Sequence, residues 1–149
     1  MFKFYKYVKA QKDSLHVEKR IGAQASGLFY LGMALTISAG ELVYAQTADI
    51  VYAISNVSVV SGDVSSTYVP EVIPVNSNQI WKAAVTTAAT AAFAVDAGVK
   101  TQIDEAATFG TGVDGGQAAA SAIWVYSFTS AASGYAYVIF PDPVNRQAG

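Results

Sequence analysis

The sequence contains no cysteine, only one histidine and few charged residues. Without cysteine, the 149-residue chain can hold neither a disulfide framework nor a thiolate zinc site. A single histidine, His16, argues against a histidine metal cluster or a Ser-His-Asp triad. Charged residues make up 13% of the chain, about half of the roughly 25% usual for soluble domains. Because disordered chains are rich in charge and poor in apolar residues, we expect a folded protein.

Leucine is also scarce, with 5 leucines against 27 valines and isoleucines. Branching at Cβ favours strands over helices, so this composition indicates an all-β fold. Short apolar runs separated by glycine, proline, asparagine and serine recur along the chain. We therefore predict a small barrel or sandwich of about ten short strands, with an extended N-terminal arm and at most one short helix.

Two hairpins give the strongest strand signals. Residues 33–37 and 41–45 are β-rich runs joined by a turn at residues 38–40. Residues 123–128 (IWVYSF) are the best candidate for a buried strand, and residues 135–140 (YAYVIF) are predicted to pair back on them. Further strands are predicted at residues 50–55, 57–60, 79–85, 92–95 and 99–103.

Three regions depart from this pattern. Pro70 and Pro74 make residues 67–75 an edge strand or an extended crossing, because proline cannot donate to a sheet. Alanine favours a helix in residues 83–97, whereas the threonines there favour strand, so a short helix within residues 83–92 stays open. Glycine-rich residues 108–116 (TFGTGVDGG) are expected to form a loop.

Charge is distributed unevenly along the chain. The first 20 residues carry six basic residues and two acids, a net charge of +4, and the rest carries three basic residues and nine acids, a net charge of −6. We therefore divide the chain into a basic aromatic N-terminal arm (residues 1–20), a single β domain (residues 21–141) and a C-terminal tail (residues 142–149). This asymmetry indicates that the arm meets an acidic partner.

Aromatic residues are interleaved with lysines in the arm. The candidate partner-binding residues are Phe2, Lys3, Phe4, Tyr5, Lys6, Tyr7 and Lys9. Such a segment is suited to adding an edge strand to a partner sheet. A solvated terminus and stacking on nucleic-acid bases are the alternatives. The rest of the chain has no basic patch, so we expect no nucleic-acid partner.

Two uncharged stretches, residues 21–40 and 115–141, are long enough to span a membrane. The second is broken by glycine and serine, which fits two strands and a turn better than a spanning helix. The N-terminal region also has some features of a secretory signal, but Glu41 interrupts its apolar run. We expect neither a membrane segment nor a signal peptide.

Motifs that carry chemistry are weak. Residues 110–115 match G-x-G-x-x-G but lack the preceding strand and the following acid of a dinucleotide site. Asp104 and Glu105 would point to opposite sides of a strand, and no calcium-loop spacing is present. Trp81 and Trp124 are interpreted as core or interface residues, with a carbohydrate platform as the alternative. We expect no catalytic residue, no cofactor and no metal, and hence no enzyme.

Four segments carry a resemblance to a known family. Residues 32–45 (GMALTISAGELVYA) follow a G-x-A-L-x-x-x-x-G-x-L pattern, and residues 50–54 (IVYAI) come shortly after. Residues 93–101 (FAVDAGVKT) and 137–140 (YVIF) complete the set. Together they resemble the opening hairpin, the following strand, a later segment and the last strand of small bacteriophage head decoration (capsid cement) proteins. Ala53 stands where that family has glycine.

This resemblance implies a compact β-barrel or β-tulip domain on the outside of a phage capsid. It also implies a homo-oligomer, often a trimer, that binds the major capsid protein, with the arm contacting neighbouring subunits. Low charge and the 9 Tyr and 7 Phe residues suit a protein that works through interfaces. We therefore expect a non-enzymatic virion protein with no membrane partner. The alternative is a phage fibre, tail or surface-binding module that recognises a cell-surface ligand.

Overall fold

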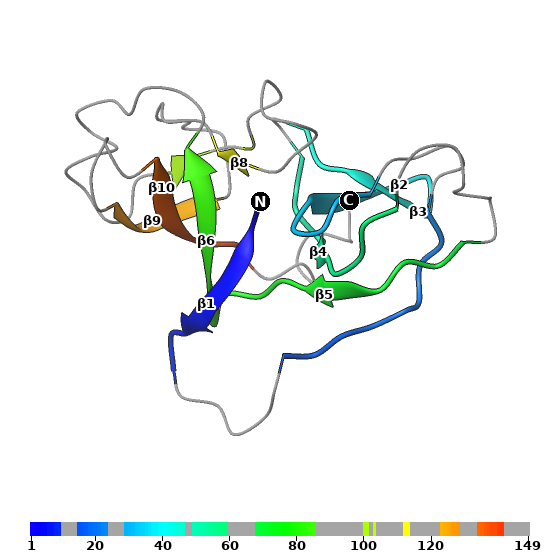
Figure 1. Cartoon of the computed structure of the whole chain (residues 1–149), viewed down its shortest axis with the longest axis horizontal. Helices are drawn as coiled ribbons and strands as arrows, with labels where there is room; N and C mark the ends of the chain where they lie inside the picture. Colours follow the sequence, from blue (N-terminus) through cyan, green and yellow to red (C-terminus); the bar gives the residue numbers. More distant parts are fainter. Residues whose placement is uncertain are drawn as a thin grey trace.

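The structure is a computed structural model, and it describes residues 1–9, 15–23, 29–46, 49–59, 68–85, 100–101, 103, 112–113, 123–128 and 134–141. These residues form ten short strands and no helix. The strands lie in two sheets, so the prediction of an all-β fold of short strands is confirmed (Figure 1). Within these ranges no helix has the length and apolar character that a membrane crossing requires.

The larger sheet contains six strands. Four of them are neighbours in the order β1 (Lys3–Tyr7), β6 (Gln79–Val85), β10 (Tyr135–Ile139) and β9 (Ile123–Phe128). Each of these neighbouring pairs is antiparallel. The sheet therefore contains the predicted hairpin partners β9 and β10, with the N-terminal strand β1 at one edge.

Two very short strands close the larger sheet on itself. β7 (Lys100–Thr101) pairs with β9, and β8 (Gly112–Val113) runs parallel to the end of β6. Ile103, two residues after β7, forms an isolated bridge with Val113 of β8. The pairing thus passes from β6 through β10, β9 and β7 and returns to β6, which gives this half of the molecule the character of a small barrel.

The smaller sheet has the order β3 (Glu41–Tyr44), β2 (Ala34–Ser38), β4 (Ala53–Ser55) and β5 (Val72–Pro74). Ser38 pairs with Glu41, which leaves a two-residue turn, and the φ angles of Ala39 and Gly40 in it are 50° and 84°. The predicted hairpin is therefore confirmed. β5 is an edge strand, as the prolines of this segment predicted.

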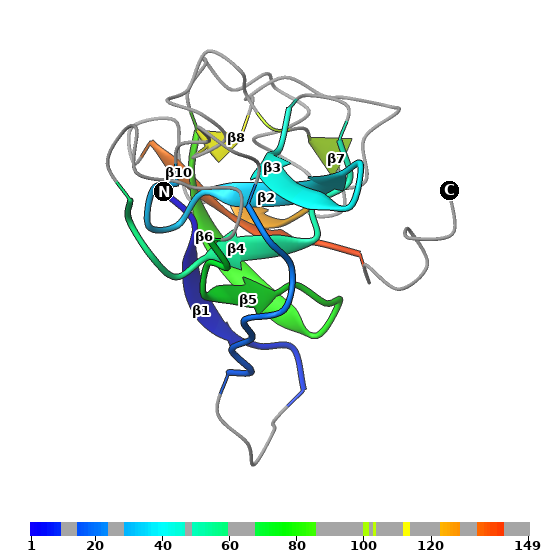
Figure 2. The same cartoon turned by 90° about the vertical axis from the view of Figure 1, so that its right-hand side faces the viewer.

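The main core lies where the two sheets face each other (Figure 2). The larger sheet contributes Trp81 and Val125, and the smaller sheet contributes Ile54; each is at most 1% exposed. Phe140, which follows β10, is fully buried in the same cluster. Burial of such large side chains is the dominant favourable term in folding, so this cluster fixes how the sheets pack.

The smaller sheet is covered on its other face as well. A second buried cluster there includes Leu35, Leu42 and Phe29. Residues 15–23 run from one edge of this sheet to the other, since Glu18 bridges Val72 of β5 and Ala23 bridges Leu42 of β3, and Ile21 packs against the second cluster. Because both of its faces are buried, the smaller sheet exposes little side-chain surface, and the exposed sheet face belongs to the larger sheet.

The segment expected as an N-terminal arm is partly a strand of the β domain. β1 pairs with β6 along its length, from Lys3 opposite Lys82 to Tyr7 opposite Gln79. Phe2, just before it, is 2% exposed and donates its backbone N–H to the carbonyl of Gly32 at 2.8 Å. Its apolar side chains give β1 a place in the core, which explains why it docks on its own chain.

One further prediction is wrong in part, and several others concern residues that the structure does not describe. The prediction of an uninterrupted loop at residues 108–116 is wrong at Gly112 and Val113, because these residues pair with β6 and Val113 is fully buried. Residues 83–85 belong to β6, and the rest of the possible helix at residues 83–92 lies outside the described residues. The acids of residues 96, 104, 105 and 114 and the tail at residues 142–149 also lie outside them.

Candidate functional site

The outer face of the larger sheet, opposite the core, carries a group of aromatic and lysine side chains. We call it the aromatic–lysine face, and it consists of Tyr5, Lys6, Lys82, Trp124, Tyr126, Tyr135 and Tyr137. Tyr5, Trp124 and Tyr126 are 49%, 42% and 41% exposed, although large aromatic side chains are usually well buried. The face spans β1, β6, β10 and β9, which lie next to one another (Figure 1).

A β-bulge in β1 shapes one side of this face. Phe4 pairs with Trp81 but Lys6 pairs with Ile80, so Tyr5 is an extra residue in the strand. The extra residue interrupts the alternation of side chains. Phe4 and Tyr7 consequently meet on the inner side, with ring centroids 5.0 Å apart, while Tyr5 and Lys6 both belong to the outer side.

A second β-bulge in β9 shapes the other side. Val138 pairs with Val125, whereas Tyr137 pairs with Ser127, which leaves Tyr126 as the extra residue. Ile123 and Val125 are buried, and Trp124 and Tyr126 are exposed. The prediction that residues 123–128 form a strand is therefore confirmed, but only one side of that strand is buried.

The side chains of the face contact one another in a row. The rings of Tyr5 and Tyr137 have centroids 4.4 Å apart, and those of Tyr137 and Tyr135 are 5.8 Å apart. The ammonium of Lys82 lies 4.0 Å from the centroid of the Tyr135 ring. The ammonium of Lys6 lies 5.3 Å from the Tyr5 ring and 5.9 Å from the Tyr126 ring. These are cation–π distances, so both lysines rest against electron-rich ring faces.

Packing beneath the row holds it in place. Ile80 neighbours the inward-pointing Trp81 along β6, so strand alternation puts it on the outer side, and it lies opposite Lys6. Ile80 is nevertheless fully buried. The side chains of the face therefore form a packed layer over the sheet.

Partial burial raises the pKa of Tyr137 above its usual value, and the neighbouring Tyr135 and Tyr5 raise it further.

The charge on this face has one sign. β1 and β6 contain lysines, and none of the strands β1, β6, β9 and β10 contains aspartate or glutamate. The acids of the described residues lie elsewhere: Glu41 is on β3 of the smaller sheet, and Glu18, Asp49 and Glu71 are outside the strands. The aromatic–lysine face can thus accept anionic groups without like-charge repulsion from its own strands.

The predicted partner-binding residues are divided by β1 between its two sides. Tyr5 and Lys6 belong to the aromatic–lysine face, and Lys3 and Lys9 are exposed. Phe2 instead packs edge-to-face against Phe140, with centroids 5.3 Å apart, and Phe4 packs against Trp81, at 5.8 Å. The sequence placed the seven residues in one set because composition does not reveal which side of a strand a residue faces.

Five residues of the face lie outside the predicted partner-binding set, and of these only Trp124 was considered, as a core or interface residue or part of a carbohydrate platform: Lys82, Trp124, Tyr126, Tyr135 and Tyr137. Two signals pointed to them, since Trp124 and Tyr126 alternate with buried aliphatic residues, and Tyr135 and Tyr137 repeat that spacing on the next strand. Trp81 is a core residue, as one interpretation of the tryptophans expected.

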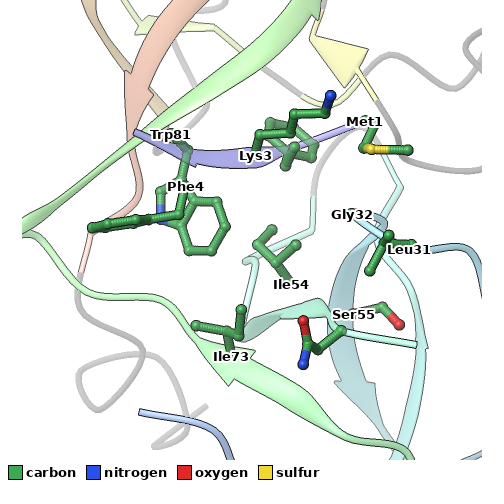
Figure 3. A pocket seen from close by; sticks show the side chains of 11 residues that line it. Met1, Lys3, Phe4, Leu31, Gly32, Ile54, Ser55, Ile73 and Trp81 are labelled. Atoms are coloured by element: carbon green, nitrogen blue, oxygen red, sulfur yellow. The ribbon is translucent and has the colours of Figure 1, made fainter. Parts of the chain in front are cut away.

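A pocket of about 270 Å³ lies between β1 and the smaller sheet (Figure 3). Phe4, Trp81, Ile54 and Ile73 give it an apolar lining, and Lys3 also contributes to its wall. The pocket faces the inner side of β1, so it is separate from the aromatic–lysine face.

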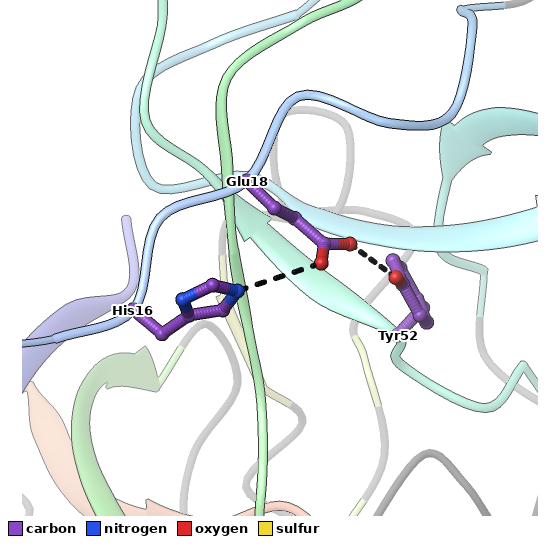
Figure 4. Close-up of polar contacts among 3 residues, drawn as sticks. All are labelled: His16, Glu18 and Tyr52. Atoms are coloured by element: carbon purple, nitrogen blue, oxygen red, sulfur yellow. Dashed lines mark hydrogen bonds and ion pairs between the residues drawn. The ribbon is translucent and has the colours of Figure 1, made fainter.

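A polar contact joins residues 15–23 to the smaller sheet (Figure 4). The hydroxyl of Tyr52 donates a hydrogen bond to Oε1 of Glu18, and Oε2 of Glu18 lies 3.7 Å from Nε2 of His16. Burial raises the pKa of Tyr52 above its usual value, and the hydrogen bond to Glu18 raises it further. His16 is exposed. This cluster anchors a segment that crosses the sheet.

Comparison with protein-family models, curated proteins and solved structures gave no match to this chain. Within the described residues there is no group of three or more histidine, aspartate or glutamate side chains placed to hold a metal ion. The geometry and charge of β1 and of the aromatic–lysine face are the features of the described residues that point to a function.

Proposed function

We propose that this chain is a non-enzymatic structural protein of a phage virion that binds the outside of the capsid and stabilises it. Its partner is the major capsid protein, and the chain acts as a homo-oligomer, with a trimer favoured. The observation that carries the proposal is the position of β1, a basic strand at the edge of the larger sheet.

An edge strand has backbone N–H and C=O groups available to a partner strand. β1 pairs with β6 on one side, and no described strand pairs with its other side. Strand addition at such an edge gives affinity through main-chain hydrogen bonds. Lys3 and Lys9 are exposed at and just beyond this strand, and they favour an acidic partner surface.

Two further features support the proposal. The run at residues 32–45, which resembles the opening hairpin of head decoration proteins, contains the β2–β3 hairpin. Charge is low and aromatic residues are numerous, as expected of a protein with much interface area. On a repeating shell, many modest contacts add up to stable attachment through multivalency.

Binding to purified capsids tests this function. We expect the full chain to co-sediment with capsids, and Lys3→Glu to weaken binding by about fivefold or more, since it reverses a charge beside the proposed contact. Lys19→Glu is the matched control, because Lys19 is equally exposed but lies in the segment that crosses the smaller sheet. Equal binding by wild type and Lys3→Glu, or no binding at all, would contradict the proposal.

The alternative function, a fibre, tail or surface-binding module, is supported by the exposed Trp124 and Tyr126. Quantitative mass spectrometry of purified virions separates the two roles. A copy number comparable to that of the major capsid protein supports decoration of the capsid. A copy number comparable to that of tail proteins supports the alternative.

A further inference from the structure

We propose that the aromatic–lysine face is a binding site for an acidic polysaccharide whose pyranose units carry carboxylates. The site does not depend on capsid attachment, because it lies on the outer face of the sheet and not at the free edge of β1. Two observations select this class of ligand: exposed aromatic rings in a row, and lysines among them with no acid on the same strands.

The rings are spread over a wide part of the outer face. Trp124 and Tyr126 are two residues apart on β9, roughly 7 Å along a strand. The rings of Tyr5, Tyr137 and Tyr135 form a row across the sheet, with interplanar angles of 41° and 80° between successive rings. The electron-rich face of an aromatic ring attracts the polarised C–H groups of a pyranose. Rings that are spread out and differently tilted can each contact a different unit of a polymer, whereas a small molecule is usually enclosed in a concave pocket.

The lysines supply the charge selectivity. Lys6 and Lys82 each rest against a tyrosine ring at cation–π distance. A cation–π contact at an exposed site is weak, so either ammonium can turn to a carboxylate while the sheet stays unchanged. The resulting charge-assisted hydrogen bond is stronger than a neutral one. A carboxylated polymer therefore gains contacts that a neutral polymer does not.

The density of charge argues for a polysaccharide over a nucleic acid. A nucleic acid carries a phosphate at every nucleotide and is bound by grooves rich in cations. The aromatic–lysine face has Lys6 and Lys82, register places Lys3 opposite Lys82 on the same side of the sheet, and the chain as a whole has a net charge of −2. A second copy of the face also fits poorly, because a two-fold contact places each lysine-bearing surface against its own like charge.

Isothermal titration calorimetry of the full chain with polygalacturonate tests the site. Dextran is the neutral control, and oligo-dT is the nucleic-acid control. We expect binding to polygalacturonate that weakens with added salt, since Coulomb attraction is screened. Trp124→Ala is expected to weaken it about tenfold, the effect of losing one stacking ring. Lys82→Gln is expected to weaken it about threefold and to reduce its salt dependence.

Two further variants complete the test: a control that removes a tyrosine outside the face, and a second variant that removes a ring of the face. Tyr44→Ala removes an exposed tyrosine from β3, in the smaller sheet, and is expected to bind like wild type. Tyr126→Leu repeats the ring removal if Trp124→Ala fails to fold, with fluorescence of the buried Trp81 as the folding readout. The proposal is overturned if the chain does not bind polygalacturonate, binds dextran equally well, or binds oligo-dT more tightly. It is also overturned if Trp124→Ala abolishes self-association and leaves the affinity for polygalacturonate unchanged.

Discussion

Tyr5 and Tyr126 are each the extra residue of a β-bulge, on β1 and β9 respectively, and the ammonium of Lys6 lies within 6 Å of both rings, at 5.3 and 5.9 Å. Bulges re-aim side chains and occur often beside functional sites. In β1 the bulge puts Lys6 on the same outer side as Tyr5, whereas Tyr126 keeps the outward position that regular alternation after Trp124 gives it. The β1 bulge thus adds a lysine to a face whose aromatic rings follow ordinary strand alternation.

Deleting Tyr5 is expected to leave the fold intact. Without the extra residue, Phe4, Lys6 and Tyr7 alternate regularly along β1, so the inner contacts of Phe4 are kept. We expect a loss of about 1 kcal/mol or less in the free energy of unfolding, measured by urea denaturation. The substitution Phe4→Ala keeps the bulge, removes the ring contact with Trp81 and should cost about 3 kcal/mol. Equal losses for the Tyr5 deletion and Phe4→Ala would show that Tyr5 is not a bulge residue.

The sequence predicted the elements whose signals are local. Turn chemistry predicted the turn at Ala39 and Gly40, and the alternation of apolar residues predicted the β9–β10 pair. Proline, which lacks a backbone donor, predicted that β5 is an edge strand. The two-residue strand β8 was not predictable, because its pairing with β6 depends on distant residues. The position of Lys6 on the face was missed for a similar reason, since a bulge is set by the register of the partner strand.

Gly32 is expected to tolerate no side chain. Its φ is +77°, and a Cβ there would lie 2.7 Å from the carbonyl oxygen of Phe2. We expect Gly32→Ala to lower the free energy of unfolding by about 2–4 kcal/mol, because both the backbone and the docking of residue 2 are disturbed.

Gly40→Ala is the control for this prediction. Its φ is +84°, but a Cβ at this position would have no other atom within 4 Å. We expect a loss of only about 1 kcal/mol from the left-handed backbone alone. Chemical denaturation measures both variants, and equal losses would mean that Gly32 does not closely approach Phe2.

Ala39→Asn is expected to stabilise the β2–β3 hairpin. Ala39 has a φ of 50°, and with Gly40 it forms a two-residue turn in which both φ angles are positive. Asparagine followed by glycine is the preferred pair for such a turn. We expect a gain of about 0.5–1 kcal/mol in the free energy of unfolding. Ala39→Val should be destabilising, since β-branched residues disfavour positive φ, and a stabilising valine would contradict the turn assignment.

Tyr52 is expected to make stability fall at high pH. Its pKa is raised in the folded chain by burial and by the hydrogen bond to Glu18, relative to an ordinary value of 10.0. The folded state therefore holds this proton more tightly than the unfolded state. The stabilisation is complete below pH 10.0 and is lost as the pH rises through the folded pKa.

Urea denaturation at a series of alkaline pH values measures this effect. The free energy of unfolding should fall less steeply above pH 10.0 in Tyr52→Phe than in wild type. If the free energy of unfolding of Tyr52→Phe falls with pH as steeply as that of wild type, Tyr52 is not the cause of the pH dependence.

Hydrogen exchange with and without purified capsids is the sharpest test of attachment to a capsid through the edge of β1. We expect the backbone amides of Lys3–Tyr7 to gain protection when capsids are added, while those of the β2–β3 hairpin exchange as before. Unchanged exchange throughout β1 in the presence of saturating capsids would contradict it.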